Sequence, residues 1–450
     1  MGLTLLAEQV SALERRTEGW IAGLQMAALS LQHRGQSEQA AFVQVVPLDD
    51  QRRWYRYHHL FADVLHARAL QQQPQQLATL HRRASEWYDA QDALAESVRH
   101  ALAAEDFAYA ADLIERIRPK IDVGYQSATW LGWVQKLPDP LVRARPVLSA
   151  GYAWALLDGG EMAACAERLR DAEAWLTDAT PTPAAEMIVA DDSQFATLPA
   201  SIAAAWAYHD LAVGDVDSAV QQAKRALELA PQTSLPWRHA AALLGLTYWT
   251  NGDLNAAERA FDDFTAGMIA AGNVQDAISA TYVLADIKQA LGHLRDAARV
   301  YDQALQHASA AGDPLPLGTA DLHRGLSEIW RECNELERAV QALQTAATLG
   351  EEDALTGWQH RLCLTRARLA QARGDLPGAF ELLDAAERHY LPTPLPDFQP
   401  VAAWHARFWA SQGDVEAALD WARVHDLAAD DALSYLREFE HVTLARVLIA

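Results

Sequence analysis

A short turn motif recurs along most of this chain at intervals of about 40 residues. Each copy has Gly or Asn first, then an acidic residue or His, then an apolar residue. The copies are Gly160-Glu161-Met162, Gly214-Asp215-Val216, Gly252-Asp253-Leu254, Gly292-His293-Leu294, Asn334-Glu335-Leu336, Gly374-Asp375-Leu376 and Gly413-Asp414-Val415. From Gly214 onward the steps are 38, 40, 42, 40 and 39 residues. A regular period of roughly 20–50 residues predicts a solenoid of helix hairpins.

The residue types in this motif suit a corner between two helices. Gly, or Asn334 in one copy, tolerates the left-handed backbone that ends a helix. The next, usually acidic residue accepts hydrogen bonds from the free N–H groups of the following helix. A small residue five positions after the Gly allows close helix approach, as at Ala219, Ala257, Ala297, Ala339, Ala379 and Ala418. The fold class predicted is all-α, a TPR-like helix-hairpin solenoid.

The spacing divides the repeats into two groups. Residues 201–450 are predicted to hold regular TPR-like repeats, and residues 73–200 divergent ones. The extra length in the divergent part falls around residues 121–146 and 177–199. Because the latter stretch is rich in Pro and Asp, it is predicted to be a loop.

Composition excludes several classes of function. The chain has 37 Lys and Arg against 60 Asp and Glu, a net charge of −23, so we expect no direct nucleic-acid binding through phosphate attraction. No apolar run has the roughly 18 residues that span a bilayer, so no membrane association is expected. The three cysteines have no metal or disulfide spacing. A cytoplasmic location is therefore predicted.

Two segments near the N-terminus resemble a known family. The run Thr17–Leu31 and the run Arg53–Phe61, which reads Arg-Trp-Tyr-Arg-Tyr-His-His-Leu-Phe, are similar to the MalT-like class of large ATP-binding LuxR-type transcriptional regulators. The resemblance implies that residues 1–45 are a helical lid remnant of a signalling ATPase. It also implies that residues 46–72 are the end of a winged-helix region, ahead of the sensor repeats.

The chain departs from that family pattern in two places. It has no Gly-x-x-x-x-Gly-Lys-Ser/Thr phosphate loop, and no basic helix-turn-helix follows the repeats. We therefore expect a fragment or a shortened relative. His58 corresponds by resemblance to a nucleotide-contacting His of an intact relative. Without a phosphate loop, it is expected here to be an ordinary core or surface residue.

No arrangement of residues indicates catalysis. The chain has no Gly-x-Ser-x-Gly, His-Glu-x-x-His or Cys-x-x-Cys motif, and its 16 histidines are scattered. We expect no enzyme activity, no cofactor and no metal site.

The remaining candidate is a surface. The first helix of each pair in such a solenoid commonly lines the concave side. The positions 13, 10 and 6 residues before each corner Gly or Asn share one face of this helix. The candidate groove residues at these positions are Tyr208, His239, Tyr282, Asp286, Asp321, Arg324, Glu328, Arg361, Arg368 and Arg407. An acidic end near Asp286 and a basic end near Arg407 are expected. The alternative is an ordinary solvated helix face.

Two functions follow from these observations. The first is the signal-sensing region of a MalT-like regulator, which binds a small-molecule inducer, or a regulatory protein or peptide, along the groove. The alternative is a stand-alone TPR-type scaffold for a partner protein or peptide.

Overall fold

The computed structural model describes residues 45–47, 55–57, 74–123, 127–176, 187–232, 234–312, 315–350 and 354–450. These residues belong to two compact units, residues 1–110 and residues 111–450. The predicted lid segment, the larger part of the predicted winged-helix end and His58 lie outside the described residues.

The first unit contains a pair of short strands ahead of its helices. Strand β1 (Val45–Pro47) pairs antiparallel with β2 (Tyr55–Tyr57), with Val46 opposite Arg56. Helices α4 (Pro74–Ala90) and α5 (Leu94–Ala103) follow. Two buried serines link these helices. The Ser85 hydroxyl donates to the Ser97 carbonyl at 2.7 Å, and the Ser97 hydroxyl donates to the Ser85 carbonyl at 2.8 Å.

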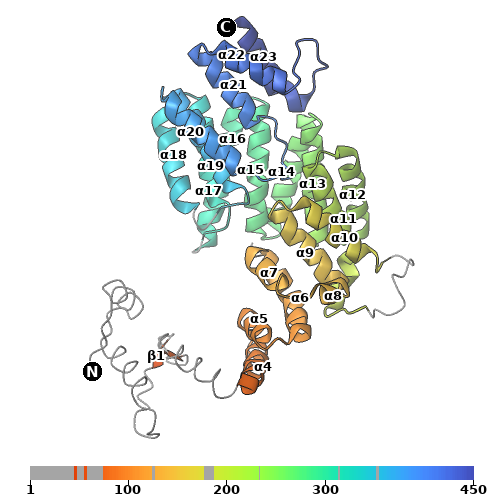
Figure 1. The fold of residues 1–450 in the computed structure, drawn as a ribbon. Coiled ribbons are helices and arrows are strands. Elements are labelled where there is room, and N and C mark those ends of the chain that lie inside the picture. The colour runs from red at the N-terminus through yellow and green to blue at the C-terminus, as the bar shows by residue number, and fades with distance from the viewer. Residues whose placement is uncertain are drawn as a thin grey trace, which may run out of the picture. The chain divides into compact units, whose positions relative to one another are not determined.

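The regular elements in the described part of the second unit are all helices (Figure 1). Helix α6 (Phe107–Val123) crosses the boundary between the units. The helices that follow are α7 (Ser127–Val134), α8 (Asp139–Arg143), α9 (Pro146–Asp158), α10 (Met162–Glu173), α11 (Asp192–Ala212), α12 (Val216–Leu229), α13 (Leu235–Thr250), α14 (Leu254–Ala270), α15 (Val274–Ala290), α16 (Leu294–Ala311), α17 (Thr319–Glu332), α18 (Leu336–Leu349), α19 (Trp358–Ala372), α20 (Leu376–Arg388), α21 (Val401–Gln412), α22 (Val415–Val424), the 3-10 turn η1 (Tyr435–Arg437) and α23 (Glu438–Ile449).

These helices form successive hairpins. The pairs are α9–α10, α11–α12, α13–α14, α15–α16, α17–α18, α19–α20 and α21–α22. First helices also contact the next first helix in several places, as α15 does with α17 and α17 with α19. The hairpin solenoid predicted from the 40-residue period is therefore confirmed.

The helix corners have the predicted backbone. All six corner glycines have positive φ, and Asn334 has φ 57°. The Asp side chain after the corner caps the next helix in four repeats, as when Asp253 accepts from the Ala256 N–H at 3.0 Å. The prediction is wrong for Glu161 and Glu335, whose side chains make no cap hydrogen bond. Asp, one methylene shorter than Glu, is the residue whose carboxylate reaches the N–H groups of the first turn.

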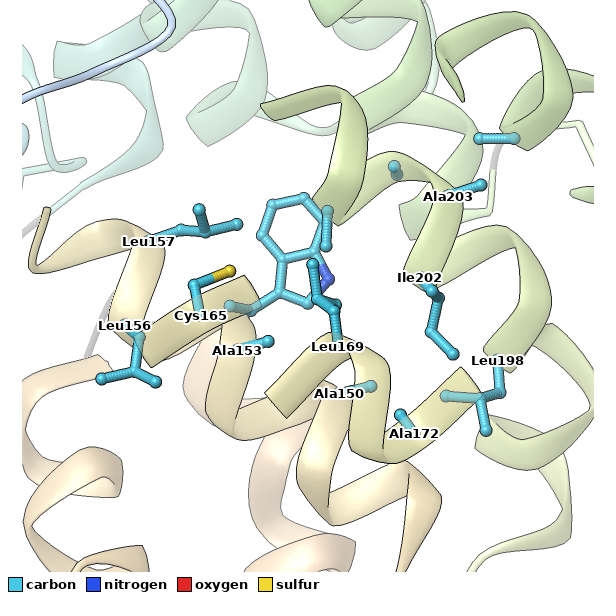
Figure 2. Close-up of a cluster of buried hydrophobic side chains, with 14 of the residues drawn as sticks. Ala150, Ala153, Leu156, Leu157, Cys165, Leu169, Ala172, Leu198, Ile202 and Ala203 are labelled. Atoms are coloured by element: carbon cyan, nitrogen blue, oxygen red, sulfur yellow. The ribbon is translucent and has the colours of Figure 1, made fainter. Parts of the chain in front are cut away.

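The small residues after the corners are buried as predicted. The six alanines at this position are all 0% exposed. Figure 2 shows the same use of small side chains in the α9–α10–α11 core, where Ala153, Cys165 and Ala203 lie among larger side chains such as Leu169 and Ile202. Small residues bring the helix axes close together, and the leucines fill the space between.

The divergent part differs from the prediction in one stretch. Residues 177–199 were expected to be a loop, but α11 begins at Asp192 and contains Pro199. Asp191 caps this helix by accepting from the N–H groups of Ser193 and Gln194. Residues 177–186 lie outside the described part of the chain. The extra length around 121–146 holds the short helices α7 and α8.

Residues 390–400, here called the crossing segment, connect α20 to α21 without regular structure. Its Leu395 and Phe398 pack against the apolar cluster of α13 and α15, and its Pro392 lies near the corner at Gly160. The segment therefore contacts repeats that are far away in sequence. Within the described residues, no helix has the length and hydropathy to cross a membrane.

Candidate functional site

Six of the ten predicted groove residues line one cavity of about 520 Å³, here called the charged cavity. They are Tyr282 and Asp286 of α15, Arg324 and Glu328 of α17, and Arg361 and Arg368 of α19. The wall is completed by further residues of these helices and of the crossing segment, including Gln289, Glu332, Leu364, Thr365, Asp397, Phe398 and Gln399.

The spacing of the sequence explains why these side chains meet. Residues four apart, such as 324 and 328, lie on one face of a helix. The same face recurs about 40 residues later in the next first helix. Because α15 contacts α17 and α17 contacts α19, the three faces meet at one place.

Arg361 is held on the cavity wall by a buried carboxylate. Asp321, which is 0% exposed, accepts from Nε of Arg361 at 3.0 Å and from Nη2 at 2.7 Å, both through Oδ1. Its other oxygen accepts from the Leu355 backbone N–H at 3.0 Å. Asp321 thus lies behind the cavity and positions a residue that lines it.

Glu328 is the centre of a second ion-pair group. It accepts from Nε of Arg331 at 3.0 Å and from Nη1 of Arg368 at 3.4 Å. Burial by itself would raise the pKa of Glu328, but Arg368 and Arg331 outweigh it and hold that pKa below its ordinary value of 4.5. Arg368 also donates to Oε1 of Gln399 at 2.8 Å, so this ion-pair group reaches the crossing segment.

Arg324 is the least satisfied charge in the cavity. It is 6% exposed, and its Nη1 donates to the Thr365 hydroxyl at 3.3 Å. Nε and Nη2 have no hydrogen-bond partner among the described residues. The guanidinium carbon lies 5.3 Å from the centre of the Tyr282 ring, within the range of a cation–π contact.

Asp286 faces the same space from α15. Its Oδ1 accepts from the Tyr301 hydroxyl at 3.3 Å, and Tyr301 is fully buried. A Cβ added at Gly325 would collide with the Tyr301 ring, so glycine at this position of α17 lets the ring reach Asp286. Burial raises the pKa of Asp286, and Arg324 offsets part of that rise.

Four predicted residues do not line the charged cavity. Asp321 lies behind its wall, and Tyr208 packs on Trp154 in the α9–α11 core. His239 borders a separate cavity of about 240 Å³. Arg407, expected at the basic end of the same groove, lines a neighbouring cavity with Trp404 and Arg446. Burial and the cations Arg446 and Arg368 lower the pKa of Arg407 to about 10.

The solvated-face alternative does not describe three of the predicted groove residues. Asp321, Arg324 and Glu328 are 0%, 6% and 3% exposed, whereas charged side chains on a solvated face remain in water. Ligand binding at these residues is still a prediction.

The candidate groove residues predicted from sequence did not include those that the crossing segment contributes to the cavity. Phe398 and Gln399 lie beyond the corner of the preceding hairpin, so counting back from corners could not place them. Their signal was the Pro-rich break between residues 392 and 400, which separates two helices by more than a tight turn. Among the described residues, no group of three or more His, Cys, Asp or Glu could hold a metal ion.

Comparison with known proteins assigns the family. The MalT-like TPR region matches residues 200–450, which is more than half of the chain. The chain belongs to the MalT-like family. The MalT winged helix domain matches residues 26–77, and together the two matches confirm the resemblance inferred from the N-terminal segments.

Relatives of this MalT-like chain are similar over part of its length. The serine/threonine-protein kinase PknK of Mycobacterium tuberculosis is 42% identical over 107 residues, and that of Mycobacterium bovis is equally similar. This alignment covers 24% of the chain and 10% of PknK. The chain therefore spans about a tenth of the length of the curated relatives it matches.

Two solved structures resemble it at low identity. A Rap protein complexed with competence and sporulation factor is 13% identical, with a TM-score of 0.49 over 78% of this chain and 87% of that one. A tetratricopeptide repeat protein from Parabacteroides merdae is 12% identical, with a TM-score of 0.42 over 68% and 99%. Because both TM-scores are below 0.5, the fold assignment rests on the family match and on the helix pairing.

Proposed function

We propose that this chain is the signal-sensing region of a MalT-like transcriptional regulator and that it binds a small inducer or regulatory peptide in the charged cavity. The observation that carries the proposal is the cavity itself. Its volume of about 520 Å³ lies within the roughly 300–1,000 Å³ typical of ligand sites. Its wall combines apolar side chains with buried charges. Buried charges cost folding free energy, and they are common at functional sites, where they bind a ligand.

The cavity is built to connect a ligand to distant repeats. One wall comes from three first helices and from the corner and start of α16, and the other comes from the crossing segment. Phe398 of that segment lies on Trp249 of α13, with ring centres 5.4 Å apart. A ligand that contacts both walls favours the arrangement in which they are close, and this is how binding shifts a conformational equilibrium. In a full-length regulator that equilibrium would be the one between inactive and active states.

The location proposed for this function is the cytoplasm, where a transcriptional regulator meets its ligand. The three cysteines are free, which fits a reducing compartment.

A ligand screen tests the proposal. Sugars, short peptides and acidic metabolites are added to the full chain, and thermal unfolding and calorimetry are measured. A ligand at about 100 times its Kd adds about 2.7 kcal/mol to the free energy of unfolding. Gln289→Trp fills the cavity from α15 without removing a buried charge, so we expect it to abolish binding. Gln344→Trp, on the exposed side of α18, is the matched control and retains binding.

Two results would overturn the proposal. One is a screen with no binder in any class. The other is a binder whose affinity is unchanged in Gln289→Trp, since it must bind elsewhere. A stable partner protein recovered with the chain, together with no small-molecule response, would favour the scaffold alternative.

A further inference from the structure

One edge of the buried Arg324 guanidinium is free. Its Nε and Nη2 have no hydrogen-bond partner among the described residues, and no ion pair joins Arg324 to any described carboxylate within 4.0 Å. The side chain nevertheless lines the charged cavity and is 94% buried, since its exposed fraction is 6%. Its hydrogen bond to Thr365 satisfies only Nη1, and buried donors of a charged group that lack a partner are unfavourable.

The neighbouring Arg361 shows which kind of group the Nε–Nη2 edge of an arginine binds in this cavity. It uses the same two nitrogens, Nε and Nη2, to bind Oδ1 of Asp321 at 3.0 and 2.7 Å. Both guanidinium carbons lie 5.3 Å from the centre of the Tyr282 ring. Two arginines of consecutive repeats thus share one aromatic contact. One has its carboxylate within the chain, and the other faces an open cavity.

The other charged residues on the cavity wall restrict which charges the ligand can carry. Arg361 is paired with Asp321, and Arg368 with Glu328. Glu332 is paired with Arg331. Among the described residues, the charged groups of the wall that have no ion pair are one cation, Arg324, and two carboxylates, Asp286 and Asp397. A phosphate would place two further negative charges beside those carboxylates, whereas a ligand with one carboxylate and one ammonium complements them.

The geometry points to a free α-amino acid as the ligand, with its carboxylate on the Nε–Nη2 edge of Arg324 and its ammonium on Asp286. This assignment rests on the proposed sensing function and specifies its ligand. Asp286 is the first of the groups that raise the pKa of Arg324, yet the two side chains are not within ion-pair distance. The ammonium and the carboxylate of an α-amino acid are bonded to the same carbon atom, so one such molecule can offer a charge to each of these two groups. Phe398, Leu364 and Leu294 give its side chain an apolar wall.

The first arm of the test uses the unchanged chain and pairs of ligands. The twenty amino acids are screened by calorimetry, and each binder is compared with its amide and its N-acetyl derivative. The amide lacks the carboxylate charge, and the N-acetyl form lacks the ammonium. We expect each derivative to bind at least about 10-fold more weakly than its parent, because each leaves a buried charge unpaired.

The second arm uses variants of the full chain. Arg324→Gln and Asp286→Asn are expected to weaken binding at least about 10-fold. Arg324→Lys keeps the charge but loses the two-nitrogen edge, and it should also bind more weakly. Arg299→Gln, an exposed residue of α16 paired with Asp296, is the matched control with unchanged affinity. Circular dichroism shows whether each variant is folded, and the ligand pairs remain decisive if one is not.

The outcomes separate this inference from the proposed function. If no amino acid binds but a sugar, peptide or organic acid does, and Gln289→Trp abolishes that binding, the sensing function stands and the amino-acid assignment is wrong. It is also wrong if an amide binds as tightly as its parent, or if Arg324→Gln retains full affinity. If nothing binds at all, both fail.

Discussion

The indole N–H of Trp249 donates a 2.8 Å hydrogen bond to the hydroxyl of Tyr435, a residue 186 positions later in the chain. Trp249 lies in α13 and Tyr435 begins η1 near the C-terminal helix. Phe398 of the crossing segment lies against both rings, with centres 5.4 Å from Trp249 and 6.2 Å from Tyr435. Three aromatic residues from three distant parts of the sequence therefore form one aromatic cluster.

Removing the hydroxyl of Tyr435 should destabilise the chain measurably. In Tyr435→Phe the Trp249 N–H, on a residue 2% exposed, loses its acceptor. We expect the free energy of unfolding in urea to fall by about 1–2 kcal/mol. Tyr248→Phe removes a hydroxyl from the neighbouring residue, which is 37% exposed, and should have no effect. Equal effects of the two variants would contradict the importance of this bond.

Two glycine substitutions should have effects of opposite sign. At both Gly214 and Gly267, an added Cβ would meet no atom within 4 Å. Gly214 has φ +88° at a helix corner, so Gly214→Ala should cost about 1–2 kcal/mol in backbone strain. Gly267 lies within α14, where Ala is preferred over Gly by about 0.5–1 kcal/mol. Urea unfolding of both variants measures the difference, and a destabilised Gly267→Ala would contradict the backbone explanation.

Glu328 should make stability depend on pH in the acid range. Its pKa in the folded chain lies below the ordinary value of 4.5, because Arg368 and Arg331 outweigh the effect of burial. A carboxylate with a lowered folded pKa stabilises the fold above 4.5. That contribution is lost as the pH falls through the folded pKa.

The variant Glu328→Gln tests this sign. At neutral pH it leaves Arg368 without its carboxylate, and we expect a loss of about 3 kcal/mol. Below pH 4.5 its stability should fall less steeply than that of the unchanged chain. Urea unfolding between pH 3 and pH 7 gives both slopes, and parallel slopes would contradict the assignment.

The three cysteines should differ in reactivity. Cys333 is exposed, whereas Cys165 and Cys363 are buried. Burial raises the pKa of Cys165 to about 12 and also raises that of Cys363, so neither forms a reactive thiolate near neutral pH. Iodoacetamide at pH 8 should modify one thiol at least about 100-fold faster than the others, as followed by mass spectrometry. In Cys333→Ser the fast reaction should disappear, and in urea all thiols should react.

The helix corners were predictable from sequence because their chemistry is local. A left-handed backbone needs Gly or Asn, and the small residue after it follows at a fixed distance along the chain. For that reason the sequence was enough to identify the six alanines, from Ala219 to Ala418, as positions where the helices approach closely. The i, i+4 spacing likewise placed Arg324 and Glu328 on one face without any knowledge of neighbouring repeats.

The closure of the cavity could not be predicted in the same way. It depends on Phe398 and Gln399, whose partners Trp249 and Arg368 are set by tertiary packing rather than by spacing along the chain. The burial of Arg324 also follows from tertiary packing. It could not be predicted from sequence, because charged residues on one helix face are typical of solvated surfaces too. Arg407 was misplaced because residues 390–400 interrupt the regular succession of hairpins before α21 begins.

The crossing segment also limits how many repeats this array can contain. In an open solenoid a hairpin can be gained or lost without consequence for repeats further away. Here Pro392 lies near the corner at Gly160, and Phe398 lies on Trp249. Both contacts come from a connection only eleven residues long, from 390 to 400. Inserting or deleting one hairpin between α13 and α20 would move these surfaces by a whole repeat and leave the segment unable to reach them.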